Sequence, residues 1–215
     1  MQYLKKLFLS VREVIFIILI QYALLLGCIL IFGIDKSIII GTIILSIFEL
    51  ICIFIKLKGI KLSFKHNYFP YILIGISLSI IYDMLIFKLG FKFDITSIPL
   101  IIELLCSGII GPVFEELLFR YSLINKLSKF NSNTLCIIIS SFIFAICHNN
   151  IVTIIYAFII GLFNSYYYLK KKDILVPIII HISSNIISSF LFDFNPYILI
   201  LGIILFIIGI ITSRK

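Results

Sequence analysis

The chain has 215 residues, of which 62% are hydrophobic and only 13% are charged, and its formal net charge is +8. A soluble domain carries roughly 25% charged residues, so this composition excludes an ordinary water-soluble fold and indicates that the solvent is lipid. Because no Pro/Gly/Ser-rich linker or low-complexity segment divides the chain, we expect a single integral membrane domain over residues 1–215.

A transmembrane helix needs about 20 mostly apolar residues. The hydropathy pattern predicts an all-α fold, a polytopic membrane helix bundle with about eight transmembrane helices. Their expected ranges are roughly 13–33, 37–55, 69–87, 97–128, 133–149, 151–169, 173–192 and 195–212. The fourth is too long for one straight crossing and contains Gly111-Pro112, where the missing proline N–H favours a kink or break.

Lys and Arg are enriched in the cytoplasmic loops of membrane proteins. With the N-terminus inside, alternation of the expected helices places 15 of the 18 Lys and Arg residues on the cytoplasmic side, all but Lys36, Lys88 and Lys92. Both termini are therefore predicted to be cytoplasmic. Topology and anionic membrane lipid explain the positive charge, and nucleic-acid binding has no support.

Three polar segments interrupt the apolar helices within a motif-bearing core of about residues 97–192, and ionisable groups inside a membrane are costly enough to indicate function. These segments contain Glu115, Glu116 and Arg120; Phe144 and His148; and His181 and Asn185. The 1.5 Å rise of a helix puts Glu115, His148 and His181 at depths of about 16, 20 and 14 Å. Three helices therefore bring polar side chains to similar depths near the middle of the bilayer.

The spacing within these segments predicts how the side chains point. Glu116 and Arg120 are four residues apart, which suits an ion pair along one helix. Glu115 lies about 100° around the helix from Glu116, so the two carboxylates cannot point the same way. His181 and Asn185 are also four residues apart and share a helix face. Glu115 is thus expected to face the histidines while Glu116 pairs with Arg120.

This set of side chains suits the activation of water. A buried carboxylate near a neutral imidazole can hold and deprotonate a water molecule, and a second His with an Asn can donate hydrogen bonds to an oxyanion. The same groups could instead bind a divalent metal such as zinc, in which case Glu115, His148 and His181 would be its ligands. Glu49, Asp83 and Glu103 are expected to be structural.

The motifs EExxxR, FxxxH and HxxxN, in this order on successive helices, resemble the CAAX prenyl protease and bacteriocin-processing (CPBP, or Abi) family of intramembrane proteases. The resemblance covers roughly Gly111 to Ile187. It implies that Glu115 is the general base and that Glu116, with Arg120 as its partner, supports it. Family members have been described both as metalloproteases and as metal-free glutamate-type proteases, and the sequence leaves both open.

The resemblance also implies roles for the other motif residues. His148 would hold the attacking water, with Phe144 as a supporting residue, and His181 and Asn185 would stabilise the oxyanion. One position departs from the family pattern, since Tyr121 stands where a small residue, often Gly, usually follows the Arg. This change alters packing beside the site and removes no catalytic group.

We therefore expect an intramembrane endopeptidase in a bacterial plasma membrane. Its substrate would be a peptide or membrane-tethered protein, processed in peptide maturation or bacteriocin self-immunity. The alternatives are a non-catalytic immunity or binding protein, an ion or proton transporter, and a polar network that only holds helices together. The transporter is disfavoured because the sequence has no evident inverted repeat.

Overall fold

The computed structural model of this protein describes residues 1–60, 62, 64–91, 98–190 and 193–214. The expected ends of the motif-bearing core, residues 97 and 192, lie outside the described residues, as do Lys61, Lys92 and Lys215. Every regular element within the described residues is a helix. The prediction of an all-α fold is therefore confirmed for this part of the chain.

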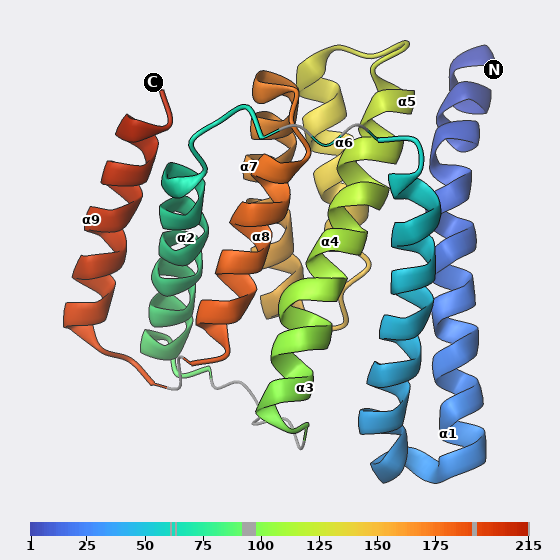
Figure 1. Ribbon diagram of the computed structural model, residues 1–215, viewed down its shortest axis with the longest axis horizontal. Coiled ribbons are helices and arrows are strands. Elements are labelled where there is room, and N and C mark those ends of the chain that lie inside the picture. The colour runs from blue at the N-terminus through green and yellow to red at the C-terminus, as the bar shows by residue number, and fades with distance from the viewer. Residues whose placement is uncertain (61, 63, 92–97, 191–192, 215) are drawn as a thin grey trace.

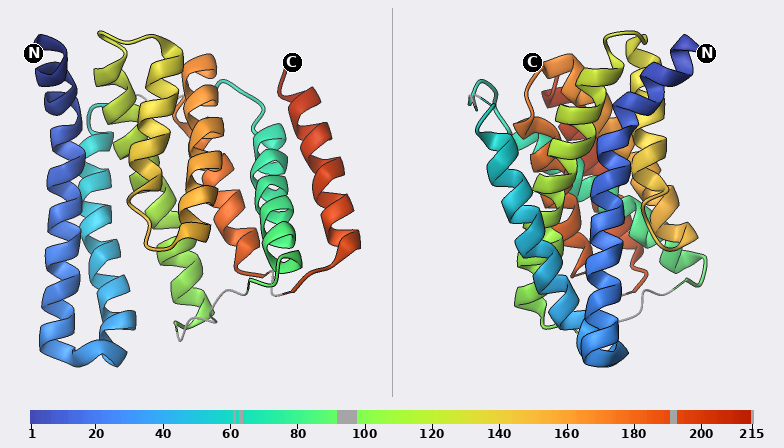
Figure 2. Two further views of the ribbon diagram at one scale, coloured as in Figure 1. Left: turned by 180° about the vertical axis from the view of Figure 1, so that it is seen from behind. Right: turned by 90° about the vertical axis from the view of Figure 1, so that its right-hand side faces the viewer.

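Helix α1 (Gln2–Leu57) consists of two helical arms that reverse direction at Gly33. Gly33 has φ +76°, a left-handed conformation that glycine adopts without steric cost because it has no Cβ. The two arms lie side by side at one edge of the bundle (Figures 1 and 2). They correspond to the first two predicted helices, and Glu13 of the first arm forms an ion pair with Lys56 of the second.

The long fourth predicted helix is present as an uninterrupted series of helical segments. They are α3 (Leu100–Leu105), η1 (Cys106–Ile110), α4 (Gly111–Glu116), η2 (Leu117–Ile124) and α5 (Asn125–Leu127), where η1 and η2 are π-helical. Of the kink or break expected at Gly111-Pro112, a break is excluded, because the chain stays helical on both sides of it. Instead η1 shifts the hydrogen bonds by one residue directly before the proline, and such π turns often occur at functional sites.

The remaining helices complete the bundle. They are α2 (Phe69–Lys88), α6 (Asn133–Ala145), α7 (Ile151–Lys171), α8 (Leu175–Ser188) and α9 (Pro196–Thr212). Helix α2 packs against both α8 and α9, and α6 packs against α7. Gly75 permits the close approach of α2 to α8, since a Cβ there would lie 2.2 Å from the carbonyl oxygen of Ile180. Small residues at such crossings are typical of helix packing in membranes.

The helices are suited to a lipid environment. Helices α1, α2 and α7 are long and apolar enough to cross a membrane, and α6, α8 and α9 are shorter apolar helices. Both chain ends lie at the same end of the bundle (Figures 1 and 2), as an even number of crossings requires. This arrangement agrees with the predicted placement of both termini on one side of the membrane.

Candidate active site

The candidate site is built around the buried carboxylate of Glu116 on α4. The Glu116 side chain is fully buried, and its Oε1 accepts hydrogen bonds from His181 Nδ1 at 2.8 Å and Asn164 Nδ2 at 2.9 Å. Its Oε2 lies 3.1 Å from Arg120 Nε, one helical turn further along the chain. The predicted ion pair between Glu116 and Arg120 is therefore present, and the carboxylate joins the fourth helix to α7 and α8.

Arg120 supplies the positive charge that makes this burial tolerable. Its side chain is fully buried, and its Nε–H is close to Glu116 Oε2 but not aligned for a hydrogen bond, so the contact is chiefly Coulombic. The guanidinium donates to the carbonyl oxygen of Gly161 at 3.4 Å and lies 4.6 Å from the centre of the Phe144 ring. Removing either partner would leave the other charge unpaired in a dry interior.

His181 on α8 contacts both glutamates of the doublet through different ring nitrogens. Nδ1 bonds to Glu116, and Nε2 lies 3.6 Å from Glu115 Oε2. Because an ionised carboxylate only accepts hydrogen bonds, Nδ1 carries the proton in this pair. The Glu115 side chain is 30% exposed while that of Glu116 is 0% exposed. As predicted, the two carboxylates point in different directions, and Glu115 faces a histidine.

His148 does not lie on a helix, although the sequence predicted one through residue 149. Helix α6 ends at Ala145, and the chain then tightens into a turn in which the His148 N–H donates to the Ala145 carbonyl at 3.1 Å. The physical reason is that Asn150 caps the next helix by accepting from the Thr153 N–H, which fixes the start of α7. His148 Nδ1 is 3.1 Å from the Phe144 carbonyl oxygen, so its Nε2 is free of this bond.

Phe144 links the two histidines. Its ring packs edge-on against His148 and His181, with centroid separations of 5.0 and 5.7 Å. Phe144 also contacts the Arg120 guanidinium, and the supporting role expected for it stays a prediction. His148 thereby belongs to the same group of side chains as His181, and its predicted role in holding water stays a prediction.

Asn185, one helical turn after His181 on α8, is bonded to a different helical segment. Its side-chain Nδ2 donates to the backbone carbonyl of Ser107 in η1 at 2.9 Å. The structure therefore brings together Glu115, Glu116, Arg120, Phe144, His148 and His181 through described contacts, and ties Asn185 to the turn that precedes α4. Its predicted contribution to an oxyanion hole stays a prediction.

One buried polar residue of the site was missed by the sequence analysis. Asn164 on α7 is fully buried and donates to Glu116. Its signal in the sequence was a single Asn inside the apolar segment 151–169. Outside the site, Asp83 accepts from Ser79 and Ser188 and Glu49 accepts from Gln21, which fits the structural roles expected for both acids.

Among the residues that the structure describes, no three His, Cys, Asp or Glu side chains form a group that could hold a metal ion. The conditional ligand set Glu115, His148 and His181 therefore stays a prediction, and the chemistry proposed below uses only protein side chains and water.

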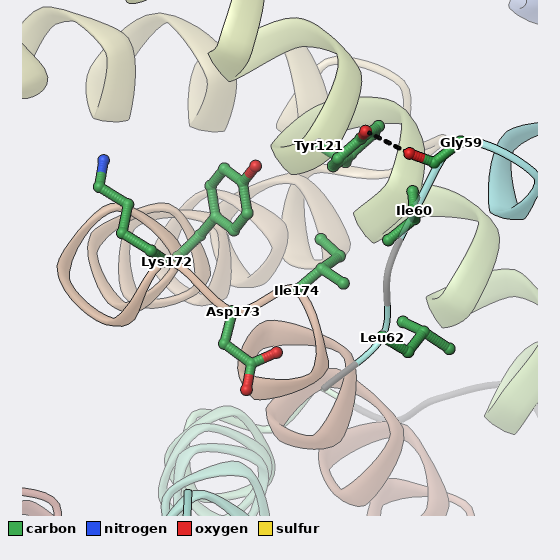
Figure 3. A pocket seen from close by; sticks show the side chains of 8 residues that line it. Gly59, Ile60, Leu62, Tyr121, Lys172, Asp173 and Ile174 are labelled. Carbon is green, nitrogen blue, oxygen red and sulfur yellow. Dashed lines mark hydrogen bonds between the residues drawn. The ribbon is translucent and has the colours of Figure 1, made fainter. Parts of the chain in front are cut away.

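A pocket with a cavity volume of about 170 Å³ lies near the start of α8 (Figure 3), and neither Glu115 nor Glu116 lines it. Its lining comprises Gly59, Ile60, Leu62, Tyr121, Tyr168, Lys172, Asp173 and Ile174. Tyr121 points toward the Gly59 carbonyl, so the side chain that departs from the family pattern lines this pocket (Figure 3). Tyr68 donates to Asp173 at 2.7 Å, and its burial together with this carboxylate raises the pKa of Tyr68 to about 12.

The part of the chain that contains the site is similar to known proteins. Residues 97–187 match the family model of Rce1-like type II CAAX prenyl endopeptidases. A protein of Bacillus subtilis (strain 168) named as a candidate membrane peptidase, YdiL, is 32% identical over 91 residues, which is 42% of this chain and 36% of that protein. The match thus spans only about a third of this relative's length. No solved structure matches the chain significantly.

Proposed function

We propose that the chain is an intramembrane endopeptidase that activates water between Glu115 and His181, in keeping with the match of residues 97–187 to the Rce1-like type II CAAX prenyl endopeptidase model. The observation that carries this proposal is the position of His181, held by Glu116 on one nitrogen and facing Glu115 at 3.6 Å with the other. A separation of 3.6 Å is too long for a direct hydrogen bond, but both atoms can share one water molecule at about 2.8 Å from each.

The proposed reaction assigns the base to Glu115. As the oxygen of the shared water attacks the carbonyl carbon of the substrate, Glu115 takes a proton from that water. The C–N bond then breaks, and Glu115 returns the proton to the leaving amine nitrogen. His148, whose ring packs edge-on against Phe144, contributes its Nε2 to holding the water.

His181 and its partners prepare the site for negative charge. Glu116 fixes the ring through Nδ1, so Nε2 is the nitrogen that faces Glu115 and the shared water. A proton that His181 already holds on Nε2 would donate a hydrogen bond to the oxyanion of the tetrahedral intermediate and stay on the ring, so it takes no part in the proton transfer through Glu115. Arg120 and Asn164 keep Glu116 ionised and correctly placed as an acceptor, which preserves the orientation of the His181 ring.

The membrane arrangement extends the proposal. Eight crossings with both termini in the cytoplasm would place the site inside the bilayer of a bacterial plasma membrane, where a peptide or membrane-tethered protein could reach the partly exposed Glu115. Peptide maturation or bacteriocin self-immunity is the proposed setting.

The test is hydrolysis by purified protein in liposomes that also contain bacterial membrane proteins, incubated in ¹⁸O-labelled water. Wild type should produce new peptide carboxyl termini that carry ¹⁸O, and Glu115→Gln and His181→Ala should not. Glu103→Gln, the same type of change on the same long helix, is the matched control and should retain the products. Identical products from Glu115→Gln would refute the assignment, and intact cellular immunity with Glu115→Gln would favour a non-catalytic binding protein.

A further inference from the structure

The hydrogen bond between Asn185 and Ser107 joins two parts of the site that are distant in sequence. Asn185 lies one helical turn after His181 on α8, and Ser107 lies in η1, directly before the segment α4 that carries Glu115 and Glu116. The bond from Asn185 Nδ2 to the Ser107 carbonyl oxygen is 2.9 Å long. It therefore connects the helix of the histidine to the helix of the two carboxylates.

The Ser107 carbonyl needs this donor because of the π turn and the proline. The Gly111 N–H, which would serve Ser107 in an α-helix, instead donates to the Cys106 carbonyl five residues back. In the same π register the donor for Ser107 would be residue 112, and this is Pro112, which has no N–H. The helix itself thus leaves the carbonyl without a donor, and an unpaired carbonyl at membrane depth is costly.

We propose that Asn185 is a positioning residue that satisfies the carbonyl orphaned by Pro112 and so fixes the separation of His181 and Glu115. This inference rests on the proposed function of the same site. The family resemblance implies that the Asn185 amide donates to the oxyanion, whereas here it donates to the Ser107 carbonyl. This bond provides a second tie between α8 and the fourth helix, one turn away from the bond between His181 and Glu116.

The test asks whether an N–H at position 112 makes Asn185 dispensable. Asn185→Ala is made in the wild-type and in the Pro112→Ala background, and both cleavage and unfolding are measured. In the wild-type background we expect Asn185→Ala to lower kcat by about tenfold or more, because a small misplacement of reacting groups is costly. In the Pro112→Ala background the loss should fall below about threefold, since the backbone N–H gained at position 112 can serve the carbonyl.

The control background is Pro70→Ala. Pro70 lies in the first turn of α2, where an N–H has no helical acceptor, so this change should not rescue Asn185→Ala. Asn185→Asp, which keeps the shape but loses the donor when ionised, should behave like Asn185→Ala. A direct oxyanion donor would give the same loss of kcat in both the wild-type and Pro112→Ala backgrounds, and that result would overturn the inference.

The unfolding measurement separates this inference from the proposed function. If wild type cleaves no peptide bond, the endopeptidase assignment fails. The unfolding midpoints of wild type, Asn185→Ala, Pro112→Ala and the double variant still report whether Asn185 and Pro112 are coupled. A smaller drop in midpoint for Asn185→Ala in the Pro112→Ala background supports the bond. Equal drops in both backgrounds refute it.

Discussion

The ion pair of Glu116 and Arg120 should behave as one unit in the free energy of unfolding. Both side chains are fully buried, so each depends on the other for neutralisation. The perturbations are Glu116→Gln, Arg120→Met and the double variant. Gln keeps the shape of Glu and its acceptor oxygen for His181, while Met keeps much of the apolar volume of the Arg side chain.

The expected magnitudes follow from the surroundings of the pair. Either single change leaves one buried charge without its partner, which costs about 3–5 kcal/mol. If the two sites were independent, the double variant would lose about 6–10 kcal/mol, the sum of these costs. Because the double variant buries neither charge, we expect it to lose less than about 4 kcal/mol, which gives a coupling energy of at least about 2 kcal/mol.

Equilibrium unfolding by sodium dodecyl sulfate in mixed micelles, followed by circular dichroism, would measure these energies. Glu103→Gln provides the matched control, because Glu103 lies on the same long helix and outside the pair. It should lower the free energy of unfolding by less than about 1 kcal/mol. A loss for the double variant equal to the sum of the single losses would show that the charges do not stabilise one another, contrary to the reasoning above.

Three further changes test other contacts. Gly75→Ala forces a Cβ against the Ile180 backbone and should destabilise the fold by about 1–3 kcal/mol in the same unfolding assay. The control is Gly27→Ala, whose Cβ meets nothing within 4 Å and which should not destabilise the fold. Equal effects of the two changes would contradict the close crossing of α2 and α8. Glu13→Gln weakens contacts to Lys56, Lys126 and Ser122 and should speed hydrogen exchange in the second arm of α1. Because Glu13 is partly exposed, the free energy of unfolding should fall by less than about 1 kcal/mol. Unchanged exchange would show that Glu13 does not hold the second arm in place. Asn164→Leu removes a donor to Glu116 and should reduce kcat by about tenfold with KM little changed; unaltered kcat would mean that Asn164 does not orient the site.

Much of the fold and part of the site follow from local patterns in the sequence. Apolar segment length predicted helices near the observed positions, because lipid-exposed helices carry a strong hydropathy signal. The i, i+4 spacing predicted the pair of Glu116 and Arg120, and the 100° rotation between neighbours predicted the separation of the two glutamates. These features depend only on the geometry of a single helix.

The features that the sequence did not predict depend on backbone hydrogen bonds. Hydropathy continues past Ala145, so it could not show that His148 lies in a turn, although the polar run from His148 to Asn150 contained the cap of α7. A shift from α to π register over five residues leaves no periodic pattern in the sequence, so the sequence could not predict η1. Asn185 bonds to a backbone carbonyl, and such a partner has no side-chain identity that a motif could reveal.

The close packing of α1 and α2 on the family-matched segment has a consequence for its modularity. Residues 97–187 contain the proposed chemistry, but α4 and η2 pack against α1, and α8 packs against α2 through the Gly75 crossing. Excised from the chain, this segment would expose faces that are shaped for those two helices. The groups proposed to be catalytic therefore depend on the rest of the bundle, and grafting them into another scaffold would require substitutes for α1 and α2 as well.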